Sequence, residues 1–372
     1  MSGLATVRAW ASERFELNRG GADHNLRSME GLRGLAVVLV FLSHYGALMR
    51  PWITDHEGLL ALTWRLVYLG GSGVDLFFLL SGFLIYGSLI GRSQAFVPYF
   101  KRRLVRLYPA FTAVFATYVL LSYTFASHSK IPEGFGAAFG YLAINFAMLP
   151  GIVPIEPMIT VAWSLSYEIA YYLAIPAVIG VLGLRAWSSA KRVQLFALLS
   201  LAAFAVFATL GGPVRLITFL AGILLHEQLS QRPGRGPSSW MAWTALLLAL
   251  ASTQCTFGDT LGYATRIAML YLLFYVVCAG SFGRPKGMFA RSFCATPLRW
   301  LGNMSYSYYL VHGLAMHAAL VAMGNFVPKE VQGPAVFFGV LPLLFLWTLL
   351  VSAGLFLVVE RPFSLTKKSK AR

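Results

Sequence analysis

The sequence predicts an all-α membrane protein, a polytopic bundle of about 10 transmembrane helices with both termini in the cytoplasm. Of its 372 residues, 58% are hydrophobic and only 12% are charged, against about 25% in an ordinary soluble domain. The formal net charge is +16. The basic residues stand mostly in short gaps between long apolar blocks, which excludes a soluble enzyme and a nucleic-acid-binding domain with a basic face.

The apolar blocks define the expected spans. A helix needs roughly 20 mostly apolar residues to cross a hydrocarbon layer about 30 Å thick. The runs that qualify are residues 32–49, 67–90, 107–126, 159–184, 194–211, 214–229, 240–257, 262–281, 300–323 and 335–359. A further run, 135–149, is shorter, and whether it spans the membrane stays open.

The distribution of charge gives the orientation. With the amino terminus inside, most of the 30 Lys and Arg residues fall in cytoplasmic segments, as the positive-inside rule requires. If 135–149 also crossed, the basic stretches 185–192, 284–299 and 361–372 would move outside. We therefore interpret 127–158 as an external excursion whose apolar piece is re-entrant or lies on the protein.

The expected organisation is a cytoplasmic tail over 1–26, one transmembrane domain over 27–363 and a basic cytoplasmic tail over 364–372 that lies against anionic lipid. The first 25 residues contain no apolar run that could be a cleaved signal core, so the first span is expected to be an uncleaved anchor. The three cysteines are scattered, and neither a disulfide framework nor a metal site is expected. No internal repeat of the transporter type is visible.

Four ionisable residues lie inside predicted spans, where each costs at least about 2.5 to 3.5 kcal/mol on insertion scales. They are His44, Asp75, Glu168 and His312. A rise of about 1.5 Å per residue places all four near one level, slightly outside the midplane. Each is therefore a candidate functional residue.

Their expected roles differ. An imidazole within reach of a buried carboxylate is the arrangement of a general base, which favours His44 with Glu168 as a catalytic pair. For His312 a packing role is an equal alternative. Asp75 follows the small-residue run 70–73 and is expected to orient neighbouring groups.

A basic cluster stands at the cytoplasmic entry of the third span, in FVPYFKRRLVRLYPAF. It consists of Lys101, Arg102, Arg103 and Arg106. Arg102 and Arg106 are four apart and share a helical face, and guanidinium groups suit phosphate recognition. Basic residues at this end can also simply orient the helix.

Five blocks together resemble the acyltransferase-3 family of integral membrane acyltransferases. In order they are GLRGLAVVLVFLSHYG, GVDLFFLLSGFLI, KRRLVRLYPAF, WSLSYE and LGNMSYSYYLVH. The first block carries the family's pattern of a basic residue, ten intervening residues and a histidine, as Arg33 and His44. The resemblance covers roughly residues 27–363. One departure is visible, because many members follow the glutamate with a second acidic residue and Gln, whereas Ile169 and Ala170 follow Glu168.

The resemblance implies transfer of an acyl group, commonly acetyl, from cytoplasmic acyl-CoA to a hydroxyl of a carbohydrate or glycoconjugate. His44 matches the proposed catalytic base and Arg33 its basic partner, while Arg102, Arg103 and Arg106 match the basic group near the CoA phosphates. Such an enzyme would lie in the inner membrane of a bacterium. Its partners would be acyl-CoA, the acceptor and membrane lipid, with neither metal nor nucleic acid.

Asp75 joins the catalytic group and Lys101 the CoA-binding group, and we place the acceptor near Ser81, Tyr167, Tyr309 and His312. A covalent acyl-enzyme through His44 or Ser81 is an alternative to direct transfer. A rival function is a proton-coupled carrier or flippase, with His44, Asp75 and Glu168 as its proton relay. The sequence leaves the acceptor, the acyl chain length and the oligomeric state open.

Overall fold

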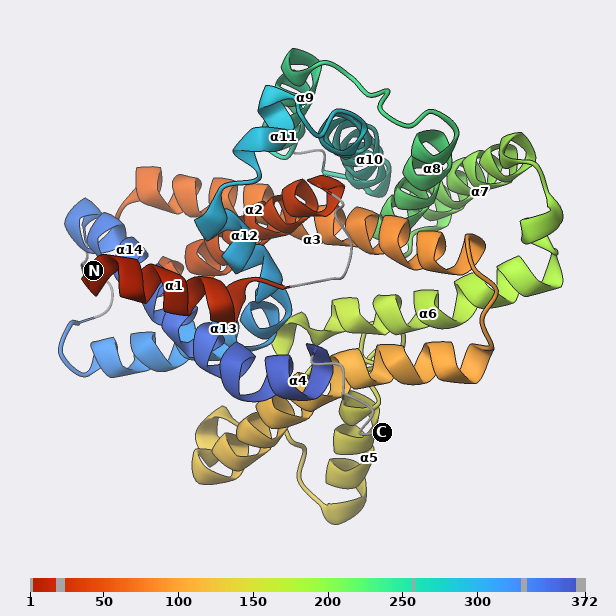
Figure 1. The fold of residues 1–372 in the computed structure, drawn as a ribbon. Coiled ribbons are helices and arrows are strands. Elements are labelled where there is room, and N and C mark those ends of the chain that lie inside the picture. Colours follow the sequence, from red (N-terminus) through yellow and green to blue (C-terminus); the bar gives the residue numbers. More distant parts are fainter. Residues whose placement is uncertain (1–2, 18–23, 256–257, 329–332, 366–372) are drawn as a thin grey trace. The chain divides into compact units, whose positions relative to one another are not determined.

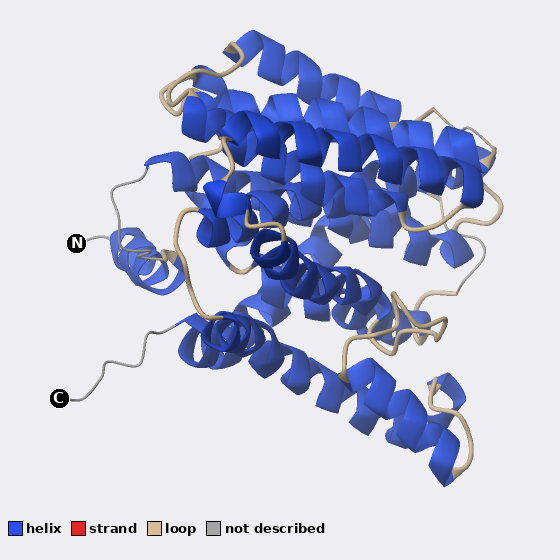
Figure 2. Ribbon diagram, turned by 90° about the vertical axis from the view of Figure 1, so that its right-hand side faces the viewer, coloured by secondary structure: helices blue, strands red, loops and turns tan. Residues whose placement is uncertain are grey.

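Helices form all the regular structure in the described part of the protein (Figure 2). The structure is a computed structural model that describes residues 3–17, 24–255, 258–328 and 333–365. Within these ranges there is no strand, which confirms the predicted all-α class. Residues 366–372 of the predicted basic tail lie outside the described residues.

The chain divides into two compact units, and unit 1 comprises Met1–Arg92, Ile179–Ser305 and Phe326–Leu341. Its helices are α1 (Gly3–Phe15), α2 (His24–Met49), α3 (Glu57–Ile90), α7 (Ser189–Leu210), α8 (Ile217–Gln231), α9 (Ser239–Ser252), α10 (Thr260–Gly283), α11 (Met288–Ser292) and α12 (Thr296–Asn303). Helix α2 packs against both α3 and α12, and α3 packs against α8 (Figure 1).

Glycines allow these helices to approach closely. A Cβ on Gly70 of α3 would lie 2.2 Å from the carbonyl oxygen of Leu39 on α2, and one on Gly302 of α12 would lie 1.7 Å from that of Glu30. Small residues at such contacts let two backbones touch, which is how helices associate in lipid. The small-residue run before Asp75 is therefore a packing surface for α2.

Unit 2 comprises Ser93–Val178, Tyr306–Asn325 and Pro342–Arg372. Its segments come from α4 (Phe96–Thr124), α5 (Phe135–Phe146), α6 (Trp163–Val181), α13 (Ser305–Gly324), α14 (Pro334–Leu355) and the π-helical segment Phe356–Leu365. The π-helical segment packs against α4.

Seven described helices are long and apolar enough to cross a membrane, in agreement with a multi-pass membrane protein. They correspond to seven of the predicted spans and include α2, α3, α4 and α6. The other three predicted spans fall on α8, α9 and α13, which are shorter or less apolar. The total number of spans and the side of the termini stay predictions.

Helix lengths bear on the predicted excursion. Helix α5 has 12 residues, which gives a length of about 18 Å, too short for a bilayer core. This agrees with the interpretation of 127–158 as a segment that does not span.

Helix α3 is longer than its predicted span. It begins at Glu57, ten residues before the predicted start.

Candidate active site

His44 lies in α2 of unit 1, and its ring bonds to the backbone of its own helix. The Nδ1 atom lies 2.9 Å from the carbonyl oxygen of Val40, one turn earlier. A carbonyl oxygen only accepts hydrogen bonds, so Nδ1 must donate, and the lone pair of the neutral ring is then on Nε2. This is the tautomer that a general base acting through Nε2 requires.

Arg33 lies on the same face of α2, because eleven residues correspond to just over three full turns. The two residues are about 16 Å apart along the helix axis. The guanidinium Nη2 of Arg33 donates to the Ser305 hydroxyl at 2.9 Å. This bond ties the half-buried arginine to the start of α13 within unit 1.

Asp75 is fully buried in α3 and forms an ion pair with Arg215. Arg215 Nη1 lies 3.0 Å from Asp75 Oδ2 and donates to the Gly71 carbonyl at 2.9 Å, while its Nε donates to the Tyr263 hydroxyl at 2.9 Å. Buried charges are tolerated when paired in this way. The contacts fit the orienting role expected for Asp75.

Glu168 lies in α6 of unit 2 and accepts a hydrogen bond from the Tyr172 hydroxyl at 2.5 Å. The Arg103 guanidinium lies 5.4 Å from the centre of the Tyr172 ring and 5.5 Å from that of Tyr99. Glu168 and Arg103 therefore share Tyr172 as a neighbour. Because His44 belongs to unit 1, its pairing with Glu168 stays a prediction.

The basic cluster separates into exposed and enclosed members. Lys101 and Arg102 are exposed, and Arg102 donates to the Gln94 side chain. Arg106 forms an ion pair with Glu360 at 2.5 Å, and the Glu360 side chain is fully buried. Glu360 also accepts from the backbone N–H of Ser307 at 3.0 Å and from its hydroxyl. Arg106 is thus part of a network that joins α4 to α13 and the π-helical segment.

His312 is fully buried in α13. Its Nδ1 lies 2.8 Å from the Tyr308 carbonyl oxygen, and its ring stacks on Tyr308 with centres 5.2 Å apart. The Tyr309 hydroxyl lies 2.7 Å from that of Ser164. The bond from His312 to its own helix is of the same kind as that of His44, so both alternatives for His312, packing and acceptor binding, stay predictions. Tyr309 lies beside the same ring, with ring centres 6.2 Å apart.

Ser81 and Tyr167 are the remaining predicted acceptor residues. Ser81 is half-buried in α3. Tyr167 is half-buried in α6, where its ring meets Trp163 edge-on at 5.8 Å. Their roles stay predictions.

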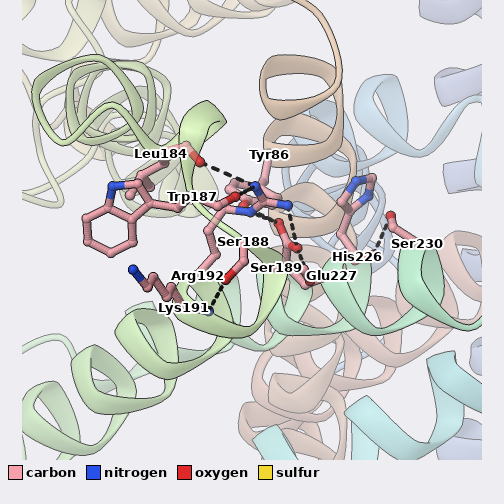
Figure 3. Close-up of polar contacts among 10 residues, drawn as sticks. All are labelled: Tyr86, Leu184, Trp187, Ser188, Ser189, Lys191, Arg192, His226, Glu227 and Ser230. Atoms are coloured by element: carbon pink, nitrogen blue, oxygen red, sulfur yellow. Dashed lines mark hydrogen bonds and ion pairs between the residues drawn. The ribbon is translucent and has the colours of Figure 1, made fainter.

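A second ionic cluster in unit 1 was not singled out by the sequence reasoning. Arg192 of α7 binds Glu227 of α8 through two bonds, Nε to Oε1 at 2.7 Å and Nη2 to Oε2 at 2.9 Å (Figure 3). Ser189 and Tyr86 also donate to this carboxylate. Glu227 and Arg215 both fall in the predicted span 214–229, so the rule that selected the four ionisable residues could have found them.

Comparison with known proteins identifies the family. A family model described as an acyltransferase domain matches residues 26–357. The chain belongs to the acyltransferase-3 family. The five sequence blocks predicted this membership correctly.

Several named relatives are acyltransferases. The chain is 28% identical over 367 residues to acyltransferase MdmB of Streptomyces mycarofaciens, covering 91% of each chain. It is 25% identical to O-acetyltransferase OatA of Staphylococcus aureus (strain NCTC 8325 / PS 47), over 77% of this chain and 50% of the relative. Peptidoglycan O-acetyltransferase OatA of Listeria monocytogenes is 25% identical, over 77% of this chain and 48% of the relative. The chain thus spans about half the length of the two OatA proteins. No solved structure matches the chain.

Proposed function

We propose that this acyltransferase-3 protein is a membrane O-acyltransferase that moves an acyl group, acetyl in the first instance, from cytoplasmic acyl-CoA to a hydroxyl of a carbohydrate or glycoconjugate. The observation that carries the proposal is the hydrogen bond between His44 Nδ1 and the Val40 carbonyl. It puts the basic lone pair on Nε2, in the residue that matches the family's histidine.

The proposed reaction is direct transfer. Nε2 of His44 accepts the proton of the acceptor hydroxyl while the hydroxyl oxygen attacks the thioester carbonyl carbon. The carbon–sulfur bond then breaks, and the departing CoA thiolate takes the proton back from the imidazolium. We assign Glu168 to stabilise the imidazolium, while Asp75, paired with Arg215, orients the groups around it.

The donor is proposed to bind through its phosphates to the exposed members of the basic cluster. Lys101 and Arg102 are exposed, whereas Arg106 is already paired with Glu360. The Arg103 guanidinium lies near the rings of Tyr99 and Tyr172. Phosphate recognition therefore falls first to Lys101 and Arg102 and then to Arg103.

The acceptor class comes from the relatives. One of them carries the name peptidoglycan O-acetyltransferase, so a cell-envelope carbohydrate is the first acceptor to test. A carrier would instead move its substrate with no acyl donor present. The test uses purified protein in vesicles. Transport of a sugar without acyl-CoA, together with no release of CoA thiol when acyl-CoA is supplied, would favour the carrier over the enzyme.

Replacement of His44 tests the proposal. General-base catalysis typically contributes 10² to 10⁴-fold, so His44→Ala should lower acyl transfer from acetyl-CoA to cell-envelope carbohydrate by about that factor. His56→Ala is the matched control, because His56 is exposed next to the start of α3. Unchanged acyl transfer by folded His44→Ala protein would exclude His44 as the base. Acyl-protein trapped after a rapid quench would show a two-step route through a covalent intermediate and exclude direct transfer.

A further inference from the structure

Unit 1 contains a cavity of about 210 Å³ between α2, α3, α8 and α10. Its inner wall is formed by the buried side chains of Met29 and Phe282 and by Phe83 and Leu229. At the other end lie Ser230, Pro233 and Gly234, which are exposed. The cavity is therefore apolar inside and open at the loop that follows α8.

His226 is the imidazole in this wall, and α3 holds its ring in place. The ring meets those of Phe83 and Tyr86 edge-on, with centres 5.4 and 5.6 Å apart. A Cβ on Gly87 would lie 2.5 Å from the ring atom Cε1 of His226. The absence of a side chain at Gly87 thus makes the space that the ring occupies.

The loop at the opening carries basic residues. Arg232 and Arg235, both exposed, flank Pro233 and Gly234 in the chain. Arg284 donates from Nε to the Gly236 carbonyl at 2.7 Å, which holds this loop against the end of α10.

The nearest carboxylate on α8 does not offset this charge. Glu227 points toward α7, where Arg192 engages both of its oxygens, while His226 beside it points to α3 (Figure 3). An ion pair of this kind is neutral as a whole. The loop at the opening therefore keeps the positive charge of Arg232 and Arg235, next to an apolar interior.

We propose that this cavity is a binding site for an anionic phospholipid, whose acyl chain enters between Leu229, Phe83 and Phe282 while its phosphate lies at Arg232 and Arg235. Basic pockets between transmembrane helices bind anionic headgroups, and apolar walls favour methylene groups over water. The positive-inside rule predicts this loop on the cytoplasmic side, so we expect the lipid to come from that leaflet. Lipid binding at this cavity is independent of the proposed acyl transfer.

The test measures lipid retention by the full-length protein with native mass spectrometry, comparing phosphatidylglycerol with phosphatidylcholine of the same chains. Wild-type protein should retain phosphatidylglycerol preferentially. The double variant Arg232→Gln, Arg235→Gln should bind it roughly 30-fold more weakly, since each arginine near a membrane surface contributes about fivefold. Arg291→Gln, an exposed arginine of α11, is the control and should bind normally.

Filling the cavity tests its interior separately. Leu229→Trp should abolish selective retention, while Leu247→Trp, an exposed leucine of α9, should not. Gly87→Ala should act like Leu229→Trp, because the new methyl group displaces the His226 ring. Folding is checked by circular dichroism and by the elution volume in detergent.

Three results would overturn the proposal. One is equal retention of the two lipids by wild-type protein, and another is undiminished phosphatidylglycerol binding in well-folded Leu229→Trp. The third is CoA binding that is lost in the cavity variants while lipid retention stays intact, which would assign the cavity to a CoA ligand. Loss of acyl transfer in His44→Ala has no bearing on any of them.

Discussion

Replacing Arg106 by alanine is expected to destabilise unit 2 by about 3 kcal/mol. Glu360 is fully buried and accepts a charged hydrogen bond from Arg106 at 2.5 Å. Removing one partner of a buried ion pair costs about 3–5 kcal/mol, because the other charge is left without compensation. Glu360 would keep its two bonds from Ser307, and the Arg106 side chain is 22% exposed, so we expect the lower end of this range.

Measuring Arg106→Ala in a Glu360→Gln variant as well separates the cost of an unpaired buried charge from the cost of a lost hydrogen bond. In Glu360→Gln protein no buried charge remains after Arg106 is removed, and the same replacement should cost about 1 kcal/mol, the value of an ordinary hydrogen bond. The coupling energy between the two residues is then about 2 kcal/mol. Arg102→Ala is the control, because this exposed neighbour should change stability by less than about 0.5 kcal/mol.

The assay is equilibrium unfolding in mixed detergent micelles followed by circular dichroism, with all variants at the same lipid and detergent ratio. An equal cost of Arg106→Ala in the wild-type and Glu360→Gln backgrounds would refute the reasoning. If stability were unchanged and acetyl-CoA binding alone were weakened, Arg106 would be a donor ligand rather than a structural residue.

Three other substitutions test separate parts of the structure. Lys101→Ala with Arg102→Ala should weaken acetyl-CoA binding by roughly 100-fold in calorimetry, since hydrogen bonds to charged groups contribute about 1.5–3 kcal/mol each; unchanged affinity would remove these residues from the donor site. Arg215→Met should lower unfolding free energy by about 3–5 kcal/mol in wild-type protein and clearly less in an Asp75→Asn background, and equal losses would argue against the ion pair. Gly70→Ala should lower the free energy of unfolding by at least about 1–3 kcal/mol, because the new Cβ would lie 2.2 Å from a backbone oxygen. An unchanged free energy of unfolding would show that α2 and α3 are not packed this closely.

Much of this protein could be predicted from local sequence pattern. Hydropathy over about 20 residues predicts helices α2, α3, α4 and α6, because burial in lipid and internal hydrogen bonding are properties of each segment by itself. The helical period places Arg33 and His44 on one face for the same reason. The family followed from the order of five short blocks, none of which needs a tertiary contact to be read.

Element ends were less well predicted where polar residues continue a helix. The sequence predicted spans from 67 and 107, whereas α3 begins at Glu57 and α4 at Phe96. A span prediction marks where apolar character starts, but a helix continues for as long as its backbone bonds are satisfied. The basic cluster therefore lies within α4.

The partners of the charged residues were decided by the tertiary structure alone. Arg106 meets Glu360, 254 positions away, and Arg215 meets Asp75, 140 positions away. A sequence shows that a buried charge needs a partner, and it even shows the depth at which the partner should lie. It does not show which of several acids at that depth is chosen, because that choice depends on how distant helices pack, and packing is settled by the fit of many side chains at once.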